Sequence, residues 1–373
     1  MTTKQHEAKM QVIDTQSRVL VAISGGIDSA TTALMLKQKG FEVVGCILQM
    51  HEYSQKNIDD AFVLCSQIGI ELTVKDVTTD FKNTVKEYFY QEYLSGRTPN
   101  PCVLCNKKLK WKSLIDVADS LNIEKIATGH YAKIKYDAEQ NRHTILKSND
   151  NKKDQTYMLW QLPQEYIKRT IFPLGEFENK DTVRHFAQKN ALPFFDNVFS
   201  KNKKDSQDIC FIDDNDYRKF LNEYSAQNNK MENISQGEIV LDGKIIGRHS
   251  GYPYYTIGQR RGLGIAYKQP LYVKNIDAKN NIIEVAIFEN TFSQGLIASE
   301  INLIKYAHLP AEKDFLVKIR YKDSGEIANC KVFDNKLIVN FHKPRSAVTV
   351  GQSVVLYEEN DLVGGGVIEE VID

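Results

Sequence analysis

The stretch Ser24-Gly25-Gly26-Ile27-Asp28-Ser29 carries residue types that bind anions. It follows a short apolar run, 19–23, which predicts a buried strand, and it precedes a segment of helix-forming composition, 30–39. A glycine-bearing turn before a helix directs free backbone N–H groups and the positive end of the helix dipole toward a ligand. The sequence therefore predicts a phosphate site in this loop.

Asp28 distinguishes this loop from a Walker-type loop, which has the pattern Gly-x-x-x-x-Gly-Lys-Ser/Thr and a lysine that reaches the phosphates. The loop has no lysine, and a carboxylate beside phosphates is best explained by a bound Mg²⁺. Ser-Gly-Gly-x-Asp-Ser after an apolar strand resembles the pyrophosphate loop of ATP pyrophosphatases, which cleave ATP between its α and β phosphates. The alternative is an ordinary glycine-rich turn of a dehydrogenase-like or flavodoxin-like domain.

Three cysteines are candidates for thiol chemistry. Cys102 and Cys105 follow two prolines, which predict an extended loop, and a helix is expected from about 106 to 121. Cys105 would then lie near the first turn of the helix, where unpaired N–H groups lower the pKa of a thiol and make it nucleophilic. Cys210 lies in a short apolar run after the polar segment 197–205. It is either a buried structural thiol or a reactive partner of the pair.

Four lysines and a tryptophan form the densest basic stretch of the chain: Lys107, Lys108, Lys110, Trp111 and Lys112. Such a stretch suits contact with RNA phosphates and stacking of a base on the indole ring. The alternative is an amphipathic helix with a solvated, charged face. The loop 254–264 contains aromatic residues, glycines, Arg260 and Arg261, and it also suits contact with a phosphate or a base.

The elements that position these residues alternate between strands and helices. Strands are expected at 41–48, 72–77 and 124–128, and helices at 58–68 and 78–94, a pattern typical of a doubly wound parallel sheet. Ligands of such sheets bind at the carboxyl ends of the strands. The loop 24–29 and the cluster Gly129-His130 should both lie there.

Further along the chain, 131–147 is expected to form a hairpin, and Asp154 to cap a helix. After about Asp214 the pattern changes to short strands, including a hairpin at 237–247 around Asp242-Gly243. We therefore predict an α/β doubly wound parallel sheet, a small β-rich linking domain and a β-barrel. The predicted boundaries are a disordered leader at 1–17, a catalytic domain at 18–214, an RNA-contacting β-rich domain at 215–291 and a barrel at 292–373.

Composition narrows the class of protein. The chain has 373 residues with 48 basic and 48 acidic side chains, so any RNA-binding surface must be local. Six cysteines in a chain of this length, with no secretory signal, indicate a reducing compartment and a cytoplasmic location. No stretch approaches the roughly 18 apolar residues of a membrane span. Cys46, Cys65 and Cys330 are interpreted as structural thiols.

Taken together, the motifs resemble those of the bacterial tRNA-specific 2-thiouridylase (MnmA) family over nearly the whole chain. The resemblance is carried by 24–29, 96–106, 127–131, 153–155, 206–212, 256–264 and 351–353. It implies ATP-dependent transfer of sulfur to C2 of the wobble uridine in the tRNAs for lysine, glutamate and glutamine. The implied sulfur donor is a cysteine desulfurase or a sulfur carrier protein.

The resemblance also implies roles for particular residues. ATP would be bound by Ala22, Ile23, Ser24, Gly25, Gly26, Ile27, Asp28 (through Mg²⁺), Ser29, Leu48 and Gly129. The target base would be approached by Asn100, Pro101 and Cys102. Contact with tRNA would come from His130, Lys153, Asp154, Gln155, Arg320, Tyr321 and Gln352, with Arg260 added from its loop. Cys105 would be the nucleophile, and Cys210 would carry a persulfide.

Cys102 departs from the family pattern, because many members carry aspartate at this position. That departure leaves the general base unassigned and creates Cys102-x-x-Cys105, which with Cys210 offers three thiolates. Three cysteines suit a [4Fe–4S] cluster with one open iron, so a persulfide relay and a cluster are both open. A zinc site is disfavoured because a fourth ligand is not apparent.

Two further functions stay open: a different pyrophosphatase, of the tRNA lysidine or argininosuccinate synthetase type, and an RNA-binding scaffold with a relic ATP site.

Overall fold

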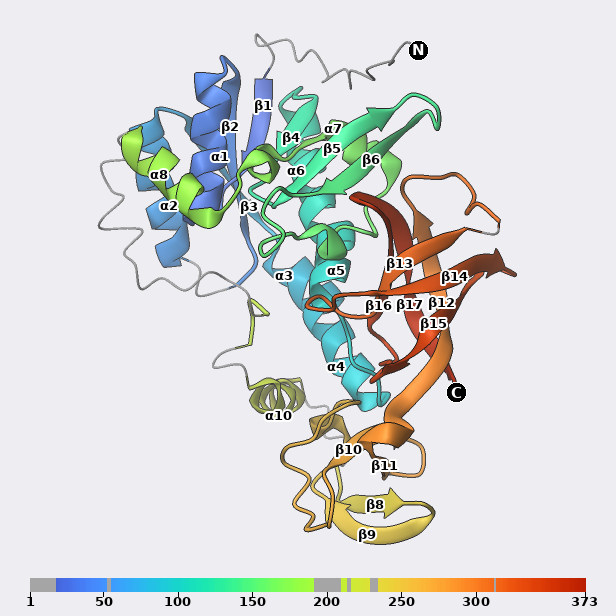
Figure 1. Ribbon diagram of the computed structural model, residues 1–373. Coiled ribbons are helices and arrows are strands. Elements are labelled where there is room, and N and C mark those ends of the chain that lie inside the picture. Colours follow the sequence, from blue (N-terminus) through green and yellow to red (C-terminus); the bar gives the residue numbers. More distant parts are fainter. Residues whose placement is uncertain (1–17, 52–54, 191–208, 213–215, 229–233, 312) are drawn as a thin grey trace, which may run out of the picture.

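The computed structural model describes residues 18–51, 55–190, 209–212, 216–228, 234–311 and 313–373 (Figure 1). The predicted leader and the polar segment 197–205 lie outside the described residues. The predicted fold class is confirmed: a parallel α/β sheet is followed by a small β domain and an antiparallel β-barrel.

A parallel sheet carries the predicted phosphate loop. Its strand order is β3 (Glu71–Asp76), β2 (Glu42–Gln49), β1 (Arg18–Ala22), β4 (Lys125–Ala127) and β7 (Thr170–Ile171). Successive side chains of a strand point to opposite faces. Val19 and Val21 of β1 therefore share a core with α1 (Ile27–Gln38) and α2 (Gln55–Ile68), whereas Leu20 packs with α6 (Trp111–Ser120). The sheet order reverses beside β1, where ligands of such sheets bind.

Two long helical segments support the carboxyl edge of this sheet. The first runs through α3 (Thr78–Phe81), a π-helical turn η1 (Lys82–Lys86) and α4 (Glu87–Leu94), as predicted for 78–94. The second runs through α5 (Pro101–Cys105), a π-helical turn η2 (Asn106–Lys110) and α6. It begins at Pro101 rather than Asn106, because proline is well tolerated at the first helical position, where its missing N–H would be unpaired in any case. The prediction of irregular structure up to Cys102 was wrong.

The rest of this region consists of short elements: η3 (Thr156–Met158), α7 (Gln164–Arg169), η4 (Pro173–Glu176), α8 (Lys180–Lys189) and α10 (Tyr217–Gln227). Asp154 does not cap an α-helix, as the sequence analysis expected, because only the single 3₁₀ turn η3 follows it. Its carboxylate instead accepts hydrogen bonds from the Ser148 N–H at 3.0 Å and the Thr156 hydroxyl at 2.6 Å.

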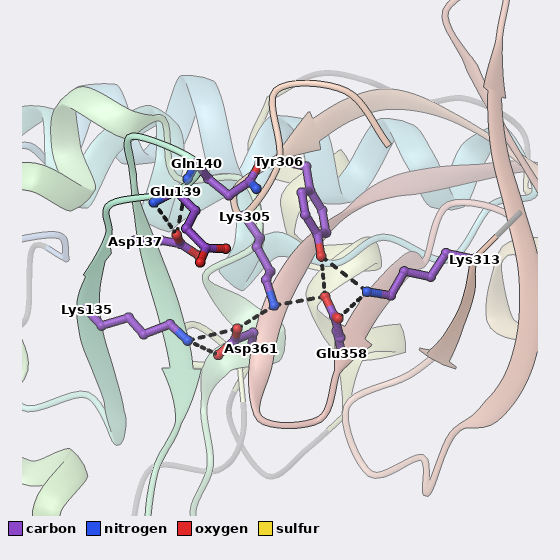
Figure 2. Close-up of polar contacts among 9 residues, drawn as sticks. All are labelled: Lys135, Asp137, Glu139, Gln140, Lys305, Tyr306, Lys313, Glu358 and Asp361. Atoms are coloured by element: carbon purple, nitrogen blue, oxygen red, sulfur yellow. Dashed lines mark hydrogen bonds and ion pairs between the residues drawn. The ribbon is translucent and has the colours of Figure 1, made fainter. Parts of the chain in front are cut away.

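The predicted hairpin at 131–147 is confirmed as β5 (Ala132–Asp137) and β6 (Arg142–Lys147). It also pairs with the barrel, since Leu146 of β6 lies opposite Asp361 of β17 (Asp361–Ile372). Figure 2 shows a charged network that reinforces this junction. Asp361 pairs with Lys135 of β5 and with Lys305, and Lys305 also pairs with Glu358, at 2.9, 2.6 and 2.8 Å respectively.

The small β domain contains β8 (Gly237–Leu241), β9 (Lys244–His249), η6 (Tyr252–Tyr254), β10 (Leu271–Asp277) and β11 (Ile282–Ile287). Its sheet has the order β10-β11-β8-β9. Asp242 and Gly243 have φ values of 49° and 76°, which is the backbone of the two-residue turn that their sequence predicts.

The barrel follows η7 (Phe288–Thr291). It consists of β12 (Phe292–Leu303), β13 (Asp314–Lys318), β14 (Glu326–Phe333), β15 (Lys336–Ser346), β16 (Ser353–Glu358) and β17, and pairing of β12 with β17 closes it. The sequence analysis assigned no strand to β12 or β17. In β17 the run Gly364-Gly365-Gly366 hides the strand, because glycine is depleted in strands. A Cβ at Gly365 would lie 2.4 Å from the Val354 carbonyl oxygen, so the close approach of neighbouring backbone requires glycine there.

Among the described residues, no helix is long and apolar enough to cross a membrane.

Candidate active site

The loop 24–29 turns sharply between β1 and α1. Gly25 has a φ of +71°, a conformation that favours glycine, and Gly26 at the N-cap position of α1 offers no side chain to the helix. The Ser29 hydroxyl accepts a hydrogen bond from the Ser24 N–H at 3.1 Å and donates one to the Gly26 carbonyl at 2.9 Å. The turn is thus held from within, while the N-terminus of α1 faces the carboxyl edge of the sheet, as an anion site requires.

Gly129 closes the other side of this loop. A Cβ on Gly129 would lie 3.0 Å from the Asp28 carbonyl carbon and 3.1 Å from the Ser29 nitrogen, so the end of β4 approaches the start of α1 as closely as glycine allows. Ala22 and Leu48 lie at the ends of the neighbouring strands β1 and β2 and are half-buried. The structure therefore brings the residues predicted to bind ATP to one edge of the sheet.

The carboxylate of Asp28 has two partners from distant parts of the chain. The Tyr131 hydroxyl donates to one oxygen at 2.8 Å, and the Lys180 ammonium donates to the other at 2.5 Å. Lys180 is only 8% exposed and opens α8, after the Asn179 cap. Although the loop itself has no lysine, the tertiary structure supplies one. The sequence analysis missed Lys180 because no local pattern links it to Asp28.

The three candidate thiols lie close enough to act on one another electrostatically. Cys102 is half-buried in the first turn of α5, Cys105 is buried one turn later, and Cys210 is exposed. Burial raises the pKa of the Cys105 thiol to about 12; Lys110 opposes this shift, and charge on Cys210 or Cys102 adds to it. The predicted lowering of the Cys105 pKa was wrong, because Cys105 lies in the second helical turn and is desolvated.

Lys110 is the member of the basic stretch that acts on the thiols. Its charge lowers the pKa of Cys102 and of Cys105, against the larger effect of burial. In a regular α-helix, residues five apart point in different directions. The π-helical turn η2 closes after five residues, which places Lys110 one turn from Cys105. This turn was not foreseen from the sequence.

Trp111 does not offer its ring to RNA, as the sequence analysis suggested. It is fully buried, and its indole N–H donates to the Thr170 hydroxyl at 2.8 Å. The rings of His130, Trp111 and Phe172 pack against one another, with the His130 centroid 5.3 Å from that of Trp111 and 6.2 Å from that of Phe172. Burial, with the charge of Lys110, lowers the pKa of His130 well below its usual value, so the imidazole is neutral at pH 7.

Phe211 fixes the segment that bears Cys210. Its ring meets Phe81, Phe89 and Phe220 at centroid distances of 5.6, 5.3 and 5.1 Å. It also packs against the cluster that contains Cys105 and, at its margin, Leu48. The exposed Cys210 is therefore held by its half-buried neighbour Phe211, which packs against the cluster that contains Cys105.

Within the described ranges, which include all six cysteines, no three or more His, Cys, Asp or Glu side chains are grouped so as to hold a single metal ion. The cysteines of a [4Fe–4S] cluster bind different irons and lie farther apart than the ligands of one ion, so the cluster stays an alternative to the persulfide relay. Cys46, Cys65 and Cys330 are buried in the cores, as a structural role predicts.

The barrel holds the loop that carries Asn100 and Pro101. The Gln352 side chain donates to the carbonyl oxygens of Thr98 and Pro99 at 3.0 and 2.9 Å. Arg97 pairs with Glu92 and with Glu369 of β17, each at 2.8 Å. Gln352 thus positions this loop from the barrel; its contact with tRNA stays a prediction.

The remaining predicted tRNA contacts fall into two places. Lys153, Asp154 and Gln155 precede η3, and Gln155 accepts a hydrogen bond from the Tyr131 N–H at 2.9 Å. Tyr321 lies near them, with its ring 6.2 Å from that of Tyr157, and Arg320 beside it is exposed. Arg260 is exposed on the loop that precedes β10 in the small β domain. The structure therefore brings Tyr321, and Arg320 next to it in the chain, to the 153–155 segment, whereas Arg260 belongs to a different domain.

A glycine-rich loop at the carboxyl edge of a parallel sheet, with three thiols supported by the helices at that edge, is typical of a nucleotide-binding α/β protein. Three family models match the chain in order: "tRNA methyl transferase HUP domain" at 17–214, "tRNA methyl transferase PRC-barrel domain" at 218–287 and "Aminomethyltransferase beta-barrel domain" at 293–368.

Curated relatives narrow this class to one family. The chain is 45% identical over 374 residues to the tRNA-specific 2-thiouridylase MnmA of Salinibacter ruber, covering 95% of each chain. It is 42% identical over 369 residues to that of Natranaerobius thermophilus, covering 94% of this chain and 97% of the relative. The chain belongs to the tRNA-specific 2-thiouridylase MnmA family, as its motifs indicated.

Solved structures give only a weak likeness. One is the U34-tRNA thiolase NcsA from Methanococcus maripaludis with its [4Fe–4S] cluster, at a TM-score of 0.35 and 17% identity, covering 60% of this chain and 70% of that one. A likeness this weak supports no inference about function.

Proposed function

We propose that this protein is a tRNA-uridine 2-sulfurtransferase that converts the wobble uridine of the tRNAs for lysine, glutamate and glutamine to 2-thiouridine. The main observation behind the proposal is that the candidate thiols and the predicted phosphate loop lie at the same edge of the sheet. Cys105 and Phe211, the neighbour of Cys210, pack with Leu48 at the end of β2, on the sheet edge where the loop 24–29 lies. A phosphate site beside two thiols suits activation of a carbonyl followed by delivery of sulfur.

The first step is adenylation, because oxide is too poor a leaving group to be displaced from uridine directly. The uridine O2 attacks the α phosphate of ATP, and pyrophosphate leaves. The N–H groups at the start of α1 would bind the departing phosphates. Lys180, 2.5 Å from Asp28, would hold this carboxylate in place and offset phosphate charge.

Asp28 would also bind the Mg²⁺ that accompanies ATP. Magnesium in nucleotide sites is commonly bound by one or two carboxylates together with substrate phosphates, and a single aspartate beside an anion loop fits this donor set. The metal would neutralise charge that develops on the phosphates.

The second step transfers sulfur. A donor protein, either a cysteine desulfurase or a sulfur carrier, first converts Cys210 to a persulfide. The Cys105 thiolate then attacks the inner sulfur of this persulfide, the S–S bond breaks, and hydrosulfide leaves as a Cys105–Cys210 disulfide forms. Hydrosulfide attacks C2 of the adenylated uridine and AMP departs. A cellular thiol reductant then restores both cysteines. In the alternative form of this route, the Cys210 persulfide itself attacks C2.

Two other chemistries are less well supported. We route no step through iron, because the described residues contain no group of three or more His, Cys, Asp or Glu side chains that could hold a metal ion and no observation favours the cluster over the relay. The family models carry the name of a methyltransferase, but a thiol pair beside a pyrophosphate-type loop favours the reaction named for the relatives. Cys102 replaces the aspartate of many family members, and we assign it no step.

The test separates adenylation from sulfur transfer. Cys105→Ser and Cys210→Ser should still form AMP with ATP and unmodified tRNA but should make no 2-thiouridine, as measured by mass spectrometry of the nucleosides. Asp28→Asn should lose both. Cys330→Ala, buried in the barrel, is the matched control and should retain both. Normal thiolation by either serine variant would refute the relay, and absence of AMP with the unaltered protein would refute the proposed function. Iron and sulfide assays after anaerobic purification test the cluster.

A further inference from the structure

Two lysines from different parts of the fold lie against one buried tyrosine ring. The Lys147 ammonium, at the end of β6, lies 4.6 Å from the centroid of the Tyr357 ring, and the Lys318 ammonium, at the end of β13, lies 5.5 Å from it. Tyr357 belongs to β16 and is fully buried. Both charges therefore lie at the seam where the β5–β6 hairpin joins the barrel (Figure 1).

The charges of these lysines are not matched by ion pairs. In the described part of the chain, neither lysine forms one: Lys147 donates to the backbone carbonyl of Glu359 at 3.0 Å, and the Asp154 carboxylate nearby is held by Ser148 and Thr156. Burial lowers the pKa of Lys147 and the charge of Lys318 lowers it further, against a smaller opposing effect of Asp154. The two partly buried cations repel each other, and both act on the carboxylate of Asp154. A phosphate in contact with both lysines would offset this repulsion further.

The surroundings of the pair indicate which anion. The Thr156 hydroxyl connects the Tyr357 hydroxyl, 3.1 Å away, to Asp154 of the predicted tRNA contacts. Lys318 is followed on the chain by exposed Arg320 and half-buried Tyr321. An arginine and an aromatic side chain beside a cationic pair are typical of RNA contact, in which cations bind phosphates and aromatic rings or guanidinium groups stack on bases.

We propose that Lys147 and Lys318 together bind one backbone phosphate of the tRNA at this seam, and so hold the tRNA across the catalytic region and the barrel at once. This inference rests on the proposed function. A shared phosphate explains why two lysines are placed over one ring without an ion-pair partner for either. It also gives the hairpin a role, since the hairpin carries one of the two cations to the barrel.

The test is the salt dependence of tRNA binding, measured with the full-length protein and an unmodified transcript of the glutamate tRNA. Each phosphate contact contributes about 1 to the slope of log Kd against log salt. The double variant Lys147→Gln/Lys318→Gln should bind more weakly and lower this slope by about 1. Lys147→Arg/Lys318→Arg should keep the slope. Lys189→Gln, an exposed lysine of α8 far from the seam, is the control for loss of charge.

Several results would contradict the shared phosphate site. An unchanged slope in a double variant with normal thermal unfolding would overturn the contact, and a drop of about 2 would overturn the shared site. Loss of binding to an acidic sulfur donor protein, with tRNA binding intact, would also overturn it. If the unaltered protein binds no tRNA, the proposed function itself fails, so the two failures are distinguishable.

Discussion

Phe211 lies edge-on against Phe89, with ring centroids 5.3 Å apart and ring planes at 88°. This contact joins the short segment that carries Cys210 to α4, in the core that α4 shares with α10. A catalytic thiol on a connecting segment must be held near its partner, because a misplacement of about 1 Å can cost about 100-fold in rate. We therefore propose that Phe211 positions Cys210.

Replacing Phe211 should separate the two steps of the reaction. We expect Phe211→Ala to lower the rate of 2-thiouridine formation by at least about tenfold, since its aromatic contacts are lost and the thiol is no longer held. AMP formation should stay within about twofold, because the ring contacts of Phe211 in the described part of the chain are with Phe81, Phe89 and Phe220 rather than with the loop 24–29. The measurement is single-turnover analysis of both products. Phe333→Ala, an exposed aromatic residue of β14, should change neither. Equal losses of both products would contradict a positioning role.

Removing the charge of Lys110 should change the pH dependence of sulfur transfer. Lys110 lowers the pKa of the Cys105 thiol, so Lys110→Gln leaves that pKa higher and the thiolate fraction at a given pH lower. We expect the rising limb of the pH–rate profile to move to higher pH by about 1 unit. Lys110→Arg should restore the profile.

The control for this prediction lies on the same helix. Lys108 is exposed, and Lys108→Gln removes an equal charge from the basic stretch. A profile that shifts equally in both variants would show a general effect of charge rather than a specific effect of Lys110 on the thiols.

Lys180 should be required for adenylation. Lys180→Gln removes the ammonium 2.5 Å from Asp28 and leaves this carboxylate with Tyr131. We expect AMP formation to fall about 100-fold, the size of effect seen when one preorganised electrostatic group is removed. Lys189→Gln, at the other end of α8, provides the matched comparison. Unchanged AMP formation in Lys180→Gln would leave this lysine a purely structural role.

The network of Figure 2 should stabilise the junction in a pH-dependent way. Burial alone would raise the pKa of Glu358, but hydrogen bonds from Lys305, Lys313 and Tyr306 lower it from 4.5 to about 2. A carboxylate whose pKa is lowered on folding stabilises the folded state above its unfolded pKa. This contribution is lost as pH falls from 4.5 toward 2.

Glu358→Gln tests the network. Because solvent screens the charges of this network, we expect Glu358→Gln to lower the free energy of unfolding by only about 1 kcal/mol at pH 7. Urea unfolding measures this free energy for the variant and the unaltered protein. The difference between the two proteins should shrink as the pH approaches 2. Glu370→Gln, in an exposed pair with Lys336, should have little effect at either pH. A difference that stays constant with pH would exclude the carboxylate as its source.

Local patterns were enough to determine most of the elements and the family. The apolar run before Ser24, the glycines after it and Asp28 specified a strand, a turn and a helix start, since each depends on neighbouring residues. The Asp242-Gly243 turn was predictable for the same reason. The three cysteines were identified by their type and by their neighbours in the sequence.

Only the tertiary structure determined which partners surround those residues and how deeply they are buried. Lys180 reaches Asp28 across 152 positions of the chain, Gln352 holds the Thr98–Pro99 loop from the barrel, and a π-helical turn brings Lys110 to Cys105. The Cys105 pKa was mispredicted because burial, which depends on packing from several elements, outweighs the effect of a nearby helix end. Side-chain type and spacing thus report what chemistry is available, whereas desolvation and long-range partners, which arise only on folding, determine how each group behaves.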